Sequence, residues 1–460
     1  MVYSLAPLTY PVPPSAAMSQ STAAAGRVAS PRRIAALALP ALVVLAAEPL
    51  YVLVDTAVVG HLGRVPLAAV AVGGTVMTLT AWIGTVVAYG TTGRAARRFG
   101  AGDRAAAVAE GVQASWSALG AGLAVVVGMQ FGGGALAGAL AGGGEVGVAA
   151  AEWLRIAAFG APGLLLAAAG NGWLRGVQDT RRPLLFVVGP NLLSAVLCPV
   201  LVYPVGMGLN GSAVANVIAQ TLSGALFAAA LVAERVALRP RPRVIGQQLV
   251  LSRDLLVRGV AFQASFLSAT AVAARFGAAT VGAHQIAVQL WFFAALVLDA
   301  LAIAAQALVG AALGGGDDAT ARALARRISR LGAICGTAFA VLAAAGAGVV
   351  PTWFSSDPAV HDQALVAWPW FAAMLPLAGV VFALDGVLIG AGDIRYLRNL
   401  TVAGALGGFL PAIWLAYALD LGLGGIWAGL MLFTVIRLVG LLLRLRSGAW
   451  AVTGAVRGAA

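Results

Sequence analysis

Apolar runs of about twenty residues recur along the whole chain, and they constrain the fold more than any other feature of the sequence. Of its 460 residues, 61% are hydrophobic and only 10% are charged, whereas about a quarter of the residues of a soluble domain carry a charge. Reading the runs between charged, Gly and Pro breaks gives twelve segments that can each cross a bilayer. We therefore predict an all-α polytopic membrane protein with twelve transmembrane helices.

The basic residues give the predicted orientation. All 29 are arginines, and most lie in alternate loops: Arg32 and Arg33, residues 94–104, Arg181 and Arg182, residues 235–258, residues 322–330, Arg395 and Arg398, and Arg444 and Arg446. The intervening loops hold little more than Arg64, Arg155 and Arg275. The positive-inside rule then places both termini in the cytoplasm, in a protein of the plasma membrane. The net charge of +12 is accounted for by this topology, so we expect no nucleic-acid partner.

The two halves of the sequence are a tandem repeat. Gly277 lies 214 residues after Gly63, and the same offset carries "NGWLRGVQDTR" (171–181) onto "DGVLIGAGDIR" (385–395) and "GLNG" (208–211) onto "GLGG" (422–425). With six helices in each half, the two copies have the same orientation in the membrane. Parallel repeats of this kind are typical of transporters that bind substrate between the halves, although channels and membrane enzymes also contain repeats.

This repeat predicts the division of the chain. We expect a disordered cytoplasmic tail at 1–33, with Met18 as an alternative start, an N-lobe at 34–233 and a cytoplasmic linker at 234–254. We also expect a C-lobe at 255–444 and a cytoplasmic C-terminal tail at 445–460. We expect the protein to be a monomer.

Four acids interrupt apolar helices and are the main candidates for functional residues. Glu48 and Asp55 are seven residues apart, so they share a helix face about 10 Å apart along the axis. Asp299 and Asp385 lie in later helices, and none of the four has an acid at its repeat equivalent. Because a charge in the membrane is costly, each should face a cavity or a polar interior. Each acid can carry a proton, bind a cation or join two helices, and these alternatives stay open for Asp299 and Asp385.

Other polar residues complete the candidate site. Pro49 removes a backbone hydrogen bond directly after Glu48, which predicts a hinge. Cavity-lining amides are expected among Asn171, Asn191, Gln263, Gln285 and Gln289, with helix–helix hydrogen bonds as the equal alternative. The three histidines share no metal-ligand spacing. We expect no metal, no organic cofactor and no enzymatic activity.

Four segments resemble one transporter family. They are "PLYVLVDTAVVGHLG", "TTGRAARRFGAGD", "VGAHQIAVQLWFF" and "GWLRGVQDTRRP". The sequence is similar to the MATE (multidrug and toxic compound extrusion) family, in the branch named after DNA-damage-inducible protein F. The resemblance implies two six-helix lobes arranged as a V, and efflux of amphipathic compounds coupled to inward flow of H⁺ or Na⁺. Substrates in the family are often organic cations, and some members export organic acids.

The resemblance also implies roles for single residues. Asp55 matches the family's cation-coupling aspartate of the first helix, and Asp385 matches an acid frequent in the tenth helix of this branch. Many relatives carry an Asn and an Asp four apart in the fifth helix, where this chain has Ser194 and Cys198. Glu48 is the alternative carboxylate partner for Asp55.

These observations lead to one functional hypothesis with two alternatives. We expect a secondary multidrug efflux transporter for cationic amphiphiles, driven by H⁺ or Na⁺. The alternatives are an organic-acid exporter and a flippase for lipid-linked substrates. A flippase cavity would carry many basic residues, whereas almost all of the arginines here are expected in the cytoplasmic loops, and acids are expected in the cavity.

Overall fold

The computed structural model describes residues 30–457, and within them all regular structure is helical. Twelve of the segments are long and apolar enough to span a membrane, as predicted. The N-terminal half contains α2 (Pro31–Gly60), α3 (Arg64–Gly100), α4 (Arg104–Ala141), α5 (Gly144–Ala157), η1 (Ala158–Gly160), α6 (Ala161–Gly176), α7 (Arg181–Val202) and α8 (Leu209–Ala233). The C-terminal half contains α9 (Pro242–Arg275), α10 (Ala278–Gly314), α11 (Asp318–Gly346), η2 (Val350–Trp353), α12 (Pro358–Gly390), α13 (Ile394–Gly404), the π-helical turn η3 (Ala405–Phe409), α14 (Leu410–Ala418) and α15 (Gly422–Ser447).

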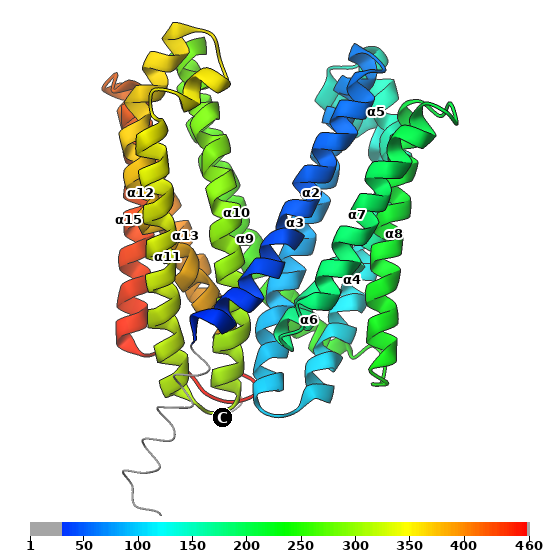
Figure 1. Ribbon diagram of the computed structural model, residues 1–460, viewed down its shortest axis with the longest axis vertical. Helices are drawn as coiled ribbons and strands as arrows, with labels where there is room; N and C mark the ends of the chain where they lie inside the picture. The colour runs from blue at the N-terminus through cyan, green and yellow to red at the C-terminus, as the bar shows by residue number, and fades with distance from the viewer. Residues whose placement is uncertain (1–29, 458–460) are drawn as a thin grey trace, which may run out of the picture.

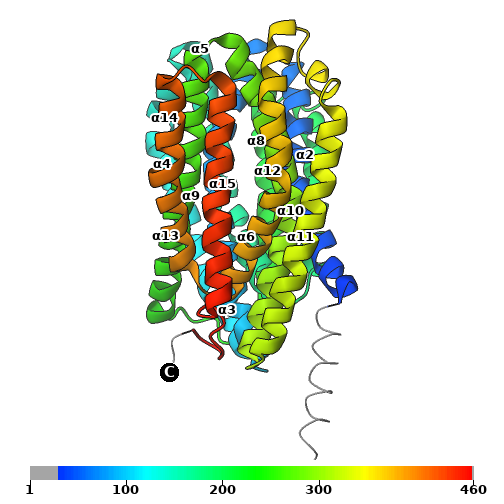
Figure 2. The same cartoon turned by 90° about the vertical axis from the view of Figure 1, so that its left-hand side faces the viewer.

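The helices form two lobes that diverge as a V (Figure 1). We call α2–α8 the N-lobe and α9–α15 the C-lobe. The lobes meet at the end that carries the turns α3–α4 and α10–α11, and the last described residues lie there too (Figures 1 and 2). We call it the basic end, because the turns and helix ends located there contain the arginine-rich segments named above.

The 214-residue offset reappears in the helix boundaries. Adding 214 to the bounds of α3 gives those of α10, and adding it to the last residue of α6, Gly176, gives Gly390, where α12 ends. Equal boundaries at a constant offset confirm the two six-helix units.

The first helix of each lobe contacts the other lobe. Ile34 and Leu37 near the start of α2 pack in a core cluster with Leu301 and Leu308 of the C-lobe. In the same way Leu255 of α9 packs against N-lobe residues of α3. Each lobe is therefore joined to its partner by an exchanged helix end at the basic end.

Glycines allow the closest approach of the lobes. A Cβ on Gly100 of α3 would overlap the backbone oxygen of Ala311, and a Cβ on Gly314 of α10 would overlap that of Arg97. Since Ala311 and Gly314 are the 214-residue equivalents of Arg97 and Gly100, the two contacts are one contact repeated by the symmetry of the repeat. Only glycine permits this backbone distance.

The structure shortens the predicted linker and packs part of the predicted C-terminal tail against the protein. Residues 1–29 of the predicted tail lie outside the described residues, while Pro31 begins α2. The connection between the lobes spans 234–241, because α9 begins at Pro242 within the segment expected to be a linker. In the predicted C-terminal tail, Trp450 is fully buried against the C-lobe core.

Candidate functional site

A polar pocket lies inside the N-lobe. Its cavity volume is about 140 Å³, and its polar lining residues are Glu48, Thr85, Tyr89, Asn171, Arg175, Asn191, Gln220 and Ser223. Glu48 comes from α2 and is accessible from the cavity. Asn171 and Asn191 each have a buried side-chain oxygen without a hydrogen-bond partner within the described residues. These two amide oxygens can therefore accept hydrogen bonds from a ligand in the pocket.

The predicted hinge lies beside this pocket. Pro49 is exposed, and α2 continues through it without interruption from Pro31 to Gly60. Its role as a hinge stays a prediction.

Asp55 occupies a separate, drier position in α2. Its side chain is 6% exposed, and its Oδ1 accepts a hydrogen bond from the Cys198 thiol at 3.2 Å. Cys198 stands where the resemblance to the family implied a different side chain, and through it α7 supplies a hydrogen-bond donor to Asp55. Across residues 30–457 no arginine lies within ion-pair distance of Asp55. A buried carboxylate without a cationic partner is costly when it is charged.

Asp385 has the opposite environment. Its Oδ2 accepts from Arg258 of α9 and, at 2.5 Å, from Arg437 of α15. Both guanidinium groups also lie over the Phe262 ring, at 5.4 and 4.7 Å from its centroid. We call Arg258, Asp385 and Arg437 the C-lobe triad. An acid held between two arginines is a helix-joining element, and its charge is already compensated.

Asp299 connects the two lobes. Its Oδ2 accepts from the hydroxyl group of Tyr89, which comes from α3 of the N-lobe. Next to this contact, Val86 of α3, Leu255 of α9 and Ile394 of α13 form a buried apolar layer with Tyr89 at its edge. The acid therefore lies where the lobes must separate if the basic end is to open.

The predicted glutamines do not come together. Gln263 is exposed and lines a small pocket of about 150 Å³ with Thr85, Tyr89 and Arg258. Gln285 and Gln289 lie on an exposed face of α10 and line none of the pockets described. The sequence had indicated their polarity, but polarity alone does not locate a side chain relative to a cavity.

Several arginines lie within the membrane-spanning helices, against the expectation that almost all of them lie in loops. Arg175, Arg258 and Arg437 lie within membrane-spanning helices, and Arg175 and Arg437 are each 5% exposed. The charge pattern predicts a basic loop at Arg258, whereas Arg258 lies inside α9 and Arg437 lies inside α15. The signal was present for Arg437, which interrupts the apolar sequence of its helix with a charge. The interior therefore contains both signs of charge, and not acids alone.

Comparisons with known proteins agree with this architecture. The model of the MatE family matches residues 40–200 and 255–414, one block in each lobe. Protein DETOXIFICATION 44, chloroplastic, of Arabidopsis thaliana is 33% identical over 438 residues, covering 91% of this chain and 83% of that protein. DNA damage-inducible protein F of Escherichia coli is 31% identical over 418 residues, covering 87% and 89%.

A solved structure of a MATE protein in the bent conformation superposes with a TM-score of 0.85 at 22% identity, covering 93% of this chain and 98% of that one. It supports the fold. The family match extends over more than half of the chain. The chain is therefore a member of the MatE family, a multi-pass membrane transporter and not an enzyme.

Proposed function

We propose that the protein exports amphipathic organic compounds across the plasma membrane by antiport with H⁺, and that Asp55 carries the proton. The observation that supports this is the contrast among the acids. Asp385 is paired with two arginines and Asp299 is bound by Tyr89, whereas Asp55 is buried with a thiol as its donor. Its charge state can therefore change without breaking an ion pair.

A proton suits this position better than Na⁺. Sodium is a hard cation that prefers several oxygen ligands, whereas a thiol is a soft ligand. A protonated carboxyl group needs only one acceptor or donor to be satisfied.

In the proposed cycle the neutral form of Asp55 drives the change in shape. Protonation removes the cost of burying the charge, so α2 can pack more closely against α7 and displace substrate from the N-lobe pocket. Loss of the proton restores the charge and reopens the pocket. The basic end then faces the cytoplasm, which places the wide end of the V outside.

The test uses everted membrane vesicles with an acidic interior, a fluorescent pH probe and no sodium. Addition of tetraphenylphosphonium should release protons with the wild-type protein and not with Asp55→Asn, which mimics the neutral acid. Asp318→Asn is the matched control, since Asp318 is an exposed residue at the basic end and should leave release unchanged. Proton release by Asp55→Asn at the wild-type rate would disprove the role of Asp55.

A second candidate function is export of amphipathic organic anions. The supporting observation is Arg175, which lines the N-lobe pocket and has no carboxylate within ion-pair distance among the described residues. In the same vesicles an amphipathic carboxylate such as fluorescein should then be transported, and Arg175→Gln should abolish that transport while tetraphenylphosphonium export continues. Equal loss of both activities in Arg175→Gln would exclude anion selection by this residue.

A further inference from the structure

A second and larger pocket opens at the basic end, between the lobes. Its volume is about 870 Å³, and α3, α4, α9, the α12–α13 turn and the C-terminal segment contribute to its wall. Ile394 belongs both to this wall and to the apolar layer formed with Val86 and Leu255. The layer separates this pocket, which we call the basic pocket, from the small pocket beside Gln263.

The charges around the basic pocket are unequal. Five arginines line it, against two acids: Arg94, Arg97, Arg243, Arg395 and Arg457, with Glu110 and Asp393. The arginines come from both lobes, with Arg94 and Arg97 on α3 and the others on α9, on α13 and in the C-terminal segment.

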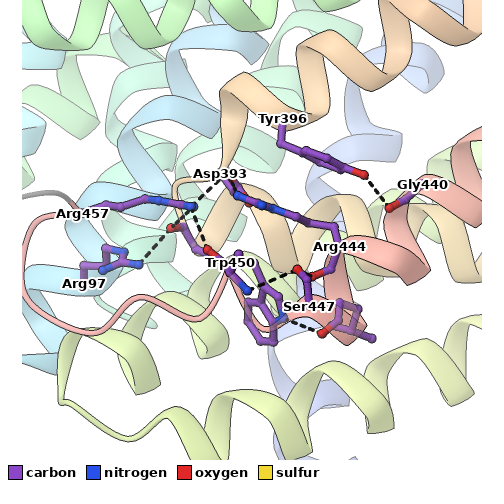
Figure 3. Close-up of polar contacts among 11 residues, drawn as sticks. Arg97, Asp393, Tyr396, Gly440, Arg444, Ser447, Trp450 and Arg457 are labelled. Atoms are coloured by element: carbon purple, nitrogen blue, oxygen red, sulfur yellow. Dashed lines mark hydrogen bonds and ion pairs between the residues drawn. The ribbon is translucent and has the colours of Figure 1, made fainter.

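Both acids are already occupied. Glu110 accepts two hydrogen bonds from Arg94, at 2.7 and 3.0 Å, and one from Gln248. Asp393 pairs with Arg444 at 2.7 Å and with Arg457 at 3.1 Å (Figure 3). Within the described residues, Arg97, Arg243 and Arg395 therefore have no acid partner.

Arg97 is the most unusual of the three. It is 3% exposed, and its guanidinium group donates to the carbonyl oxygens of Gly454, Ala391 and Val452 at 2.8, 2.9 and 2.8 Å. Its Nε is buried without any partner. Figure 3 shows Arg97 near Arg457. A buried cation that is met only by backbone dipoles and lies near a second cation favours an anion in the adjoining space.

We propose that the basic pocket binds a phosphate-bearing anion, held by Arg243 and Arg395 at its open side and attracted by the charge of Arg97 at its inner side. Arginine suits this ligand because its planar group presents parallel N–H donors to phosphate oxygens. The source is either a phospholipid headgroup or a soluble phosphate compound. The site is distinct from the N-lobe pocket and does not depend on which compound is exported.

The first measurement is calorimetric titration of the purified full-length protein in nonionic detergent with inorganic tripolyphosphate, at about 0.15 M ionic strength to screen weak surface attraction. The wild-type protein should bind at a saturable site. Arg243→Gln/Arg395→Gln should weaken binding by about tenfold or more, because it removes two charge-assisted interactions. Both residues are exposed, so the variant should fold.

Arg326→Gln/Arg327→Gln is the matched control, because it removes the same charge from two exposed residues of α11 outside the pocket. Its affinity should stay within about twofold of wild type. Equal weakening by both variants would show general attraction to a basic protein and overturn the proposal.

A second arm identifies the source. The protein is placed in phosphatidylcholine nanodiscs with or without phosphatidic acid, and its melting temperature is measured with and without tripolyphosphate. Stabilisation by phosphatidic acid that requires Arg243 and Arg395 assigns the pocket to a lipid headgroup, and stabilisation by tripolyphosphate alone assigns it to a soluble phosphate. If neither stabilises the wild-type protein and no saturable binding is seen, the proposal is wrong.

Discussion

The two lobes have the same helices but different interiors. Three positions that line the N-lobe pocket have charged equivalents 214 residues later: Val44, Asn171 and Ser223 correspond to Arg258, Asp385 and Arg437. In addition, Glu48 corresponds to Phe262, whose ring lies under both arginines. One lobe is hollow and polar where the other is filled by an ion-paired cluster. The two copies of one scaffold therefore differ in their interiors. The N-lobe has space for a ligand, and the helices of the C-lobe are joined by ion pairs in the same place.

The lobes are equal at the glycine contact between α3 and α10, although the Tyr89–Asp299 hydrogen bond between them has no such counterpart. The reciprocal contacts of Gly100 and Gly314 use equivalent atoms in both copies, because a two-fold arrangement requires the same surface from each. The two copies differ inside the lobes and also at the Tyr89–Asp299 contact, whose 214-residue equivalents are Ile303 and Thr85.

The largest loss of stability is expected when the C-lobe triad is broken. Asp385→Ala leaves the buried Arg437 and the partly buried Arg258 without their acid, which costs about 3–5 kcal/mol. Asn171→Ala, at the equivalent N-lobe position, removes only a neutral pocket residue and should cost about 1 kcal/mol. Melting temperatures followed by tryptophan fluorescence in detergent compare the two. If both variants lowered the melting temperature equally, the proposed difference between an ion-paired C-lobe interior and a neutral N-lobe pocket would be wrong.

A triple variant sharpens this test. Arg258→Val/Asp385→Asn/Arg437→Ser gives the C-lobe the three residues that the N-lobe has, and it removes the charges together. Because no charge is left unpaired, it should recover much of the stability lost in Asp385→Ala. A triple variant less stable than Asp385→Ala would show that the arginines stabilise the lobe by packing.

A smaller effect should come from the shared contact. Gly100→Ala and Gly314→Ala each place a methyl group against the backbone of the other lobe, and overpacking of this kind costs about 1–3 kcal/mol. Since the contact is reciprocal, the two variants should lower the melting temperature by similar amounts. Gly74→Ala is the control, because a Cβ there meets nothing within 4 Å. A large fall in melting temperature for only one of the two variants would show that the two contacts are not equivalent.

The smallest effect concerns an ion cluster of the N-lobe alone. Glu234 accepts from Arg104 at 2.7 Å and from Arg182 at 3.3 Å, and these hydrogen bonds lower the pKa of its carboxyl group. The stabilisation is therefore complete above the unfolded pKa of about 4.3 and is lost as pH falls through the lower folded value. Glu234→Gln should cost less than about 1 kcal/mol at pH 7. Melting temperatures that differ equally at pH 7 and near pH 3 would contradict this origin.

Much of the architecture could be predicted from local sequence. Apolar length predicted twelve spans, and the constant offset between "NGWLRGVQDTR" and "DGVLIGAGDIR" predicted two equal lobes. Apolar length depends only on neighbouring residues, and the repeat depends only on residue identity at a fixed spacing. The hydrogen bond from Cys198 to Asp55 could not be predicted, because the resemblance implied only that Cys198 departs from the family's usual residue, and the packing of α7 against α2 brings the thiol to the acid.

The partners of the charged residues could not be predicted in the same way. Asp385 lies 127 residues from Arg258 and 52 from Arg437, and no local pattern joins residues that far apart. The sequence alone therefore predicts a loop at Arg258 and is compatible with either ion coupling or a structural role for Asp385. Only the packing of α9, α12 and α15 shows that its charge is compensated.

The sequence by itself determined the membrane environment, the number of spans and the duplicated plan, because the cost of placing backbone and charge in lipid acts on each segment separately. The tertiary structure alone decided which acids are paired and which remain free. An ion pair depends on distances between helices that are remote in sequence, and the energy of a buried charge changes by several kcal/mol with its nearest neighbours. The same four acids in the same order would have different chemistry in another packing.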